Sequence, residues 1–175
     1  MRSGKEYIGS SRLLSEKKLT AGTMGTIVIE YTAGKYGIDD RGSFQLAWRG
    51  ISDMLVPQFD YPDQQGYTTW SSTGNIKIRT SFEKYLRPYQ SSIRFQIYDG
   101  YLKEGEKLTI TIGDKSKGGP GIRLQSFYER ELEFVPLVDA CGTCRFERVE
   151  GELFMEVLPG KENSYQICMP SLVEP

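Results

Sequence analysis

Along two stretches of the chain every second residue is apolar, and this alternation restricts the fold more than any other feature of the sequence. In residues 92–98 and 107–112 the alternate positions hold only Ile, Leu and Phe. Because successive side chains of a strand face opposite sides of a sheet, both stretches predict strands with one buried face. A shift of one residue would bury Arg94 or Lys107, so the facing of each strand is strongly specified.

Shorter copies of the alternating pattern occur along the rest of the chain, and glycine-rich turn signals separate them. Closely spaced strands without helical crossovers between them are typical of antiparallel sheets. The sequence therefore predicts an all-β fold, an antiparallel β-sandwich that is immunoglobulin-like or related to that fold. The shorter copies are centred on residues 27–31, 44–48, 76–78, 132–134 and 165–169.

A chain of 175 residues fits one domain with short flanking segments. We expect residues 1–24 to form an N-terminal arm, a short helix or an edge strand, and within it only residues 10–18 have a helical pattern. Residues 25–170 are predicted to form the sandwich domain. The Pro-bounded residues 171–175 are interpreted as a connector to a following domain.

The chain contains no histidine, and this absence limits its chemistry. Without histidine there is no Ser-His-Asp or Cys-His nucleophile and no His-ligated zinc or iron site. Lys and Arg total 22 and Asp and Glu total 23, so the concentrated basic surface of a nucleic-acid binder is missing. We therefore expect no cofactor and no nucleic-acid partner.

No apolar stretch approaches the roughly 18 residues of a membrane span, and the first residues lack the apolar segment of a signal peptide. The chain has three cysteines, an odd number that agrees with a reducing compartment. We expect no membrane contact and a cytoplasmic location.

The glycine-rich loop at residues 113–123 has two interpretations. Its glycines together with Lys115, Lys117 and Arg123 suit the binding of a small anion. A phosphate loop, however, leads into a helix, whereas this loop lies between two extended segments, and Pro120 removes a backbone donor. The pattern favours a structural connection between strands.

Cys141 and Cys144 are separated by two residues, the spacing of half a zinc site or of a redox pair. Structural zinc needs four ligands, and only Cys168 remains in the chain. A thioredoxin-like pair lies at a helix N-terminus, whereas this pair follows a predicted strand. We favour a turn with two partly buried thiols and keep the pair as a weak metal candidate.

Several predicted loops carry aspartates. Their oxygens suit a hard cation such as Ca²⁺, but no loop has ligands at alternating positions as an EF-hand does. Capping of turns by the carboxylates is therefore favoured. The aspartates are Asp39, Asp40, Asp53, Asp60, Asp63 and Asp114.

Aromatic residues gather around the Pro-rich segment at residues 53–66. A flat aromatic surface with polar neighbours binds sugars or partner chains in many sandwiches, and Tyr61, Tyr67 and Trp70 are the candidates here. Packing in the core is the favoured explanation of such rings. The full set is Phe59, Tyr61, Tyr67, Trp70, Tyr85 and Tyr89.

Five separated blocks occur in a fixed order between residues 27 and 138, namely residues 31–40, 47–49, 52–53, 57–58, and 113–114 with 119–127. With these blocks the chain resembles the N-terminal region of a large uncharacterised bacterial family, known as a domain of unknown function. Longer members of that family look similar to PHP (polymerase and histidinol phosphatase) metal-dependent hydrolases in a later domain. Because such sites are rich in histidine, the resemblance implies no catalytic residue in this chain.

Charged residues within these blocks are expected to meet. We predict that two arginines and four aspartates form a hydrogen-bonded network that fixes the loops at one end of the sandwich. Its members are Asp39, Asp40, Arg49, Asp53, Asp114 and Arg123.

Two functions compete at this point. The first is a non-catalytic accessory domain that docks on a following PHP-type hydrolase domain or on another chain. The alternative is a module that binds a carbohydrate or a small anion through Tyr61, Tyr67, Trp70 and the loop at residues 113–123. An independent enzyme is disfavoured, because carboxylates, cysteines and lysines would be its acid–base groups.

Overall fold

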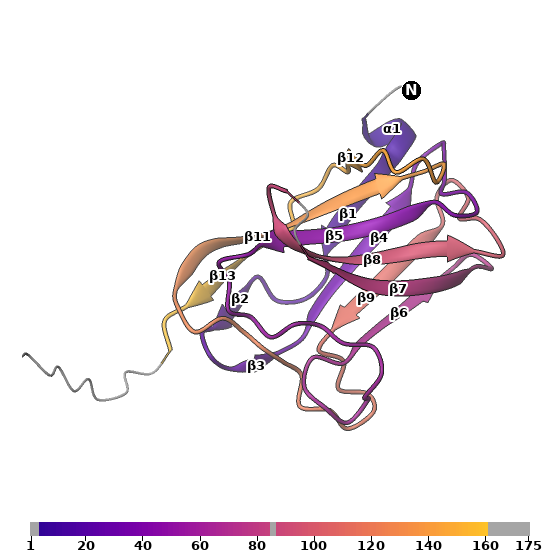
Figure 1. Ribbon diagram of the computed structural model, residues 1–175. Helices are drawn as coiled ribbons and strands as arrows, with labels where there is room; N and C mark the ends of the chain where they lie inside the picture. The colour runs from indigo at the N-terminus through magenta and orange to yellow at the C-terminus, as the bar shows by residue number, and fades with distance from the viewer. Residues whose placement is uncertain (1–3, 85–86, 161–175) are drawn as a thin grey trace, which may run out of the picture.

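A computed structural model describes residues 4–84 and 87–160, and it shows two β-sheets packed face to face (Figure 1). Within the described residues the helix α1 (Lys5–Ile8) has four residues, and no helix has the length and apolar character needed to cross a membrane. The remaining regular structure is strand.

The smaller sheet has four strands in the order β1-β4-β9-β6, all paired antiparallel. Its strands β4 and β9 are central, and β1 and β6 are the edges. The bounds are β1 (Gly9–Leu13), β4 (Ile27–Ala33), β6 (Thr68–Ser72) and β9 (Lys107–Ile112).

The larger sheet runs in the order β2-β13-β11-β5-β8-β7, and β12 pairs with β11 outside this path. Its pairs are antiparallel except for β2 and β13, which are parallel. A separate two-stranded ladder joins β3 and β10. The bounds are β2 (Lys18–Thr20), β3 (Met24–Gly25), β5 (Ser43–Arg49), β7 (Lys77–Lys84), β8 (Gln90–Tyr98), β10 (Ile122–Arg123), β11 (Glu129–Asp139), β12 (Glu147–Arg148) and β13 (Phe154–Leu158).

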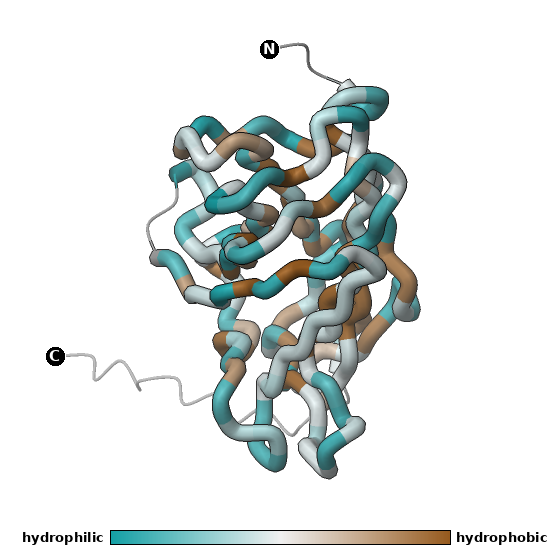
Figure 2. Tube along the Cα trace, turned by 90° about the vertical axis from the view of Figure 1, so that its right-hand side faces the viewer, coloured by the Kyte–Doolittle hydropathy of each residue, from teal (hydrophilic) through white to brown (hydrophobic). Residues whose placement is uncertain are grey.

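The core lies between the two sheets. The ring of Tyr31 on β4 lies 5.0 Å from that of Phe44 on β5, and Phe44 lies 6.5 Å from Phe95 on β8. All three residues are fully buried. Hydrophobic and hydrophilic residues alternate along the strands in Figure 2. Along β9, buried residues alternate in the same way with partly exposed ones. The predicted antiparallel β-sandwich is confirmed, and its immunoglobulin-like character stays a prediction.

The helix expected at residues 10–18 is wrong. Residues 9–13 form the edge strand β1, and the short helix precedes them at residues 5–8. The helical pattern does not decide the structure here, because β1 pairs antiparallel with β4, and Arg12 on β1 forms an ion pair with Glu30 on β4. The first 24 residues thus contribute strands to both sheets. The strand predicted at residues 165–169 and the connector at 171–175 lie outside the described residues.

Strand β5 separates two ends of the sandwich that matter for function. It begins after the loop at residues 34–42 and pairs there with the last residues of β11, so that loop and residues 140–146 lie at one end, called the thiol end. It finishes at residue 49, before the long loop at residues 50–67. That loop and residues 113–128 form the other end, called the loop end, and they come together at the bottom of Figure 1.

Candidate binding site at the loop end

Backbone hydrogen bonds join the two long loops of the loop end. The N–H of Leu55 donates to the carbonyl oxygen of Arg123 at 3.0 Å, and that of Gly66 donates to Gly121 at 2.8 Å. The N–H of Asp114 donates to the carbonyl oxygen of residue 67 at 2.7 Å. Residues between 47 and 68 positions apart in sequence are therefore held side by side.

Asp53 fixes the first loop to the second through its side chain and its main chain. Its Oδ1 accepts the backbone N–H of Ser126 at 2.7 Å, and Arg123 Nη2 donates to its carbonyl oxygen at 2.8 Å. The carboxylate also lies 3.7 Å from the Arg123 guanidinium. The bond from Ser126 is the main reason that the pKa of Asp53 is lowered, because it stabilises the charged form.

Asp114 makes a second connection at this end. Its Oδ2 accepts the hydroxyl of Thr69 on β6 at 2.7 Å, and its Oδ1 accepts the N–H of Ser116 at 2.8 Å. Burial would raise the pKa of Asp114, but these hydrogen bonds outweigh it and lower the pKa. The Asp114 carboxylate thus already accepts the hydrogen bond of the Ser116 N–H, which an anion would need. This geometry favours a structural role of the loop over anion binding.

Gly119 brings the two loops into contact. A Cβ added at this buried position would lie 2.8 Å from the carbonyl oxygen of Pro62 and 3.2 Å from that of Gln64. Both distances are shorter than ordinary contacts to main-chain atoms, which cannot rotate aside. Glycine is therefore the residue that permits this approach.

A cavity of about 500 Å³ opens between the joined loops. Leu55 and Pro120 supply its apolar surface, and Asp63, Gln64 and Gln65 supply its polar rim. The side chains of these three polar residues bond to no other residue that the structure describes. Their oxygens and amide groups are free to bind a ligand.

Gln58 orders the loop that carries this rim. Its Oε1 accepts the N–H groups of Asp60 and Tyr61, each at 2.9 Å, and its Nε2 donates to the carbonyl oxygen of Tyr61 at 2.7 Å. The Tyr61 residue is 58% exposed. These three hydrogen bonds of Gln58 order the main chain around the exposed Tyr61, beside the rim residues.

The predicted aromatic surface of Tyr61, Tyr67 and Trp70 is wrong as a set, because only Tyr61 is exposed. Trp70 on β6 lies across from the buried Ile110 and packs against the core. Tyr67 is half-buried. The alternation of β6 explains this, because Trp70 occupies an inward position of an edge strand.

Of the six predicted members of the charged network, only Asp53 and Arg123 contact each other. Arg49, Asp53, Asp114 and Arg123 are at the loop end, but Arg49 pairs with Glu129 at 3.5 Å and joins none of the others directly. A single network of six was wrong, because Asp39 and Asp40 lie at the thiol end. There the N–H of Asp39 donates to Ala140, and Asp40 Oδ1 accepts the N–H of Asp99 at 3.0 Å.

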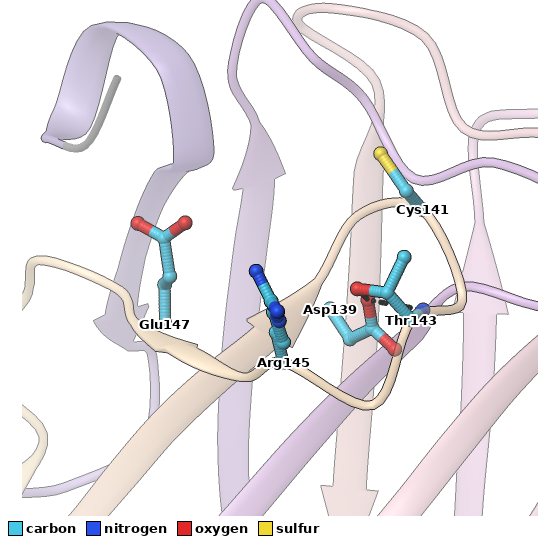
Figure 3. Close-up of a pocket in the computed structure, with 5 residues that line it drawn as sticks. All are labelled: Asp139, Cys141, Thr143, Arg145 and Glu147. Carbon is cyan, nitrogen blue, oxygen red and sulfur yellow. Dashed lines mark hydrogen bonds between the residues drawn. The ribbon is translucent and has the colours of Figure 1, made fainter. Parts of the chain in front are cut away.

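The thiol end holds Cys141 and Cys144 in the turn that follows β11, and Figure 3 shows Cys141 there. Both cysteines are free and exposed, so the expectation of partly buried thiols is wrong. The buried carboxylate of Asp139 accepts the N–H of Thr143 at 3.0 Å and that of Cys144 at 2.7 Å. This carboxylate orders the turn from inside, which leaves the thiols in solvent. Across the described residues, no three His, Cys, Asp or Glu side chains are grouped to hold a metal.

Sequence reasoning missed the residues that shape both ends. Gln58, Gln64 and Gln65 stand in a loop where polar residues are ordinary, and only the run of planar amides beside a tyrosine was a usable signal. Asp139 is the last residue of a strand, where an aspartate attracts no attention. Its position just before the two cysteines was the only indication that it caps their turn.

Comparison with known proteins finds no matching family model and no matching curated protein. Solved structures do match. AvmM, which catalyses macrocyclization in alchivemycin A biosynthesis, is 12% identical with a TM-score of 0.39, over 91% of this chain and 97% of that one. The family 3a carbohydrate-binding module from the CipA scaffolding of Clostridium thermocellum is 12% identical with a TM-score of 0.42, over 78% of this chain and 97% of that one. At these values neither likeness assigns a function to this chain.

Proposed function

We propose that this chain is a carbohydrate-binding β-sandwich module whose site is the cavity at the loop end. The observation that carries the proposal is the cavity's composition: an apolar surface of Leu55 and Pro120 faces planar polar side chains that have no protein partner among the described residues. Ligand sites combine apolar surface with a few polar groups that fix orientation.

The polar rim suits neutral hydroxyl groups better than an anion. An amide offers both a donor and an acceptor, and a carboxylate offers acceptors, so Gln64, Gln65 and Asp63 together match hydroxyls that donate and accept. No lysine or arginine lines this cavity in the described chain, and Asp63 would repel an anion. Carbohydrate is therefore favoured over the small anion within the alternative function.

The rim is also preorganised. Gln58 holds the main chain of the loop, and the bonds between the two loops fix the cavity walls before any ligand arrives. Ordering a mobile loop on binding costs affinity, so a loop that is already ordered keeps more of its contact energy. The exposed Tyr61 adds a rigid ring of the kind that stacks on the apolar face of a sugar.

A thermal-shift screen followed by calorimetry tests the proposal. The probes are neutral gluco-, xylo- and manno-oligosaccharides, with inorganic phosphate and sulfate as the anion arm. A ligand present at 100 times its Kd should stabilise the chain by about 2.7 kcal/mol. A flat response to all glycans, or a response to the anions alone, would exclude the proposal.

Variants then locate the site. Replacing both Gln64 and Gln65 by Ala should weaken glycan affinity about tenfold, because two hydrogen bonds are lost. Tyr101→Ala is the matched control, since Tyr101 is 53% exposed but lies outside the loop end. If both variants lost the same amount of glycan affinity, the binding site would lie elsewhere on the molecule.

A second candidate, an accessory domain that docks on a following domain or another chain, is favoured by one observation. Four apolar side chains are exposed on the adjoining segments at residues 51–56 and 122–128, around the Asp53 and Arg123 pair. Calorimetric titration of this chain against such a domain tests it, with Tyr128→Ser expected to weaken binding and Tyr36→Ser to leave it unchanged. The apolar residues are Ile51, Val56, Phe127 and Tyr128.

A further inference from the structure

The two exposed thiols stand in a turn whose shape is fixed independently of the loop end. Asp139 is 1% exposed and accepts hydrogen bonds from the main chain of both Thr143 and Cys144. Cys144 adopts a left-handed conformation with a φ of 60°. A buried carboxylate that shapes an exposed Cys-X-X-Cys turn holds both thiols at the surface, where a reagent reaches them.

Cys141 also lines a cavity of about 540 Å³ together with charged residues. Figure 3 shows its sulfur, the Arg145 guanidinium and the Glu147 carboxylate around this cavity. The side chains of Arg145 and Glu147 form no ion pair and no hydrogen bond with another described residue. The cavity therefore offers a free cation, a free anion and a thiol to one ligand.

We propose that this cavity is a thiol–disulfide exchange site for a low-molecular-weight disulfide that carries carboxylate and ammonium groups. Arg145 binds a carboxylate of the disulfide and Glu147 binds its ammonium group, which brings the disulfide to Cys141. The inference stands on the thiol end alone and does not depend on carbohydrate binding.

The exchange takes place in two balanced steps. The Cys141 thiolate attacks one sulfur of the disulfide, a mixed disulfide forms, and the second half leaves as a thiolate that takes up a proton from water. Cys144, three positions away, then attacks the Cys141 sulfur as a thiolate and releases the first half as a thiol. The products are the Cys141–Cys144 disulfide and two small thiols, so the protein loses two electrons and the small disulfide gains them.

Cys141 is assigned as the attacking residue because it lines the cavity, whereas Cys144 does not. The main chain of Cys144 is bound to Asp139, which keeps the second cysteine close to the first during exchange. This division of roles predicts different products when each cysteine is removed.

The first test uses the full chain with Cys168→Ser, so that only the two cysteines of the turn react, and oxidised glutathione as the probe. Intact mass spectrometry should show a protein that has lost two hydrogens, with little glutathione adduct. Cys144→Ser should accumulate one adduct, mapped to Cys141, and Cys141→Ser should react at least about tenfold more slowly. Equal adduct formation on either cysteine, or no reaction at either one, would overturn the proposal.

The second test separates binding of charge from ordinary thiol reactivity. Arg145→Gln should slow the reaction with oxidised glutathione about twofold to fivefold, as expected for the loss of one exposed ion pair. The same variant should react at an unchanged rate with bis(2-hydroxyethyl) disulfide, which carries no charge. Equal slowing with both reagents, or no slowing with glutathione, would show that the charged cavity does not select the disulfide.

Discussion

The two ends of the sandwich use their aspartates in different ways. At the loop end Asp53 bonds to the main chain 73 residues away and Asp114 bonds to Thr69, 45 residues away. At the thiol end Asp139 bonds to residues four and five positions along its own turn. At the loop end two carboxylates reach distant segments, whereas at the thiol end the carboxylate beside the thiols caps its own turn, although Asp40 there bonds to Asp99, 59 residues away.

This difference determines what each end can do. Long-range contacts fix two loops relative to each other, so a cavity between them keeps its shape and can bind a ligand without reorganising. The local cap orders the turn around the thiols without a contact from the loop end, so the turn can change its covalent state with little effect on that end. The following predictions test that division.

The largest effect is expected from Gly119→Ala at the loop end. The new Cβ would lie 2.8 Å from the Pro62 carbonyl oxygen, so the loops must separate, and we expect the free energy of unfolding to fall by about 2 kcal/mol. Glycan binding should be lost with it. Urea unfolding followed by tryptophan fluorescence measures the change.

Gly118→Asn is the matched control for that substitution. Gly118 has a φ of 90° and open space around its Cα, and asparagine tolerates left-handed backbone. We expect this variant to change stability by less than about 0.5 kcal/mol. If the two variants were equally destabilised, close packing of the loops would not be what holds this end together.

The contrast between the ends also shows how much the sequence could predict. The alternation of apolar and polar residues predicted residues 107–112 as a strand, and these are the bounds of β9. The prediction succeeds because in a half-buried strand every second side chain faces the core. The turn around Cys141 was likewise placed correctly after β11. Local signals of this kind need no knowledge of the rest of the chain.

The candidate site was harder to predict, because its contacts join segments that are far apart in sequence. Nothing near Asp53 indicates that its partner is the main chain of Ser126, and a bond to a backbone N–H leaves no signal in the partner's residue type. Asp39 and Asp40 were grouped with Asp53 by composition, although β5 places them at opposite ends. The amide rim at Gln64 and Gln65 became visible only when the two loops were seen to enclose a cavity.

The next largest effect is expected from Asp53→Ala. The variant loses the bond to the Ser126 N–H and the contact with Arg123. We expect the free energy of unfolding to fall by only about 1 kcal/mol, because the Asp53 side chain is 47% exposed and solvent screens its charge. Asp40→Ala at the thiol end is the control, with one exposed bond to Asp99, and should cost less. Chemical denaturation of both variants tests the order, and the reverse order would contradict the comparison.

Acid should weaken the loop end by a smaller amount. The pKa values of Asp53 and Asp114 are lowered from 3.8, so folding favours their charged forms. Their stabilisation is complete above the unfolded pKa and is lost as the pH falls through the lowered folded values, which lie below about 4. Stability measured between pH 6 and pH 2.5 should therefore decline less steeply when both residues are replaced by Asn. If stability fell with pH as steeply in that double variant as in the unchanged protein, these two carboxylates would not be a cause of the loss of stability in acid.

The smallest effect is expected at the thiol end, from Cys141→Ser. Cys141 is exposed, so the substitution should change the free energy of unfolding by less than about 0.5 kcal/mol. Combined with Gly119→Ala, it should add to the larger loss within about 0.5 kcal/mol, because distant sites with no shared partner are independent. A double-mutant cycle in urea measures this sum. A coupling well above that limit would mean that the turn and the loop end share a structural element, and the thiols would then report on the binding cavity.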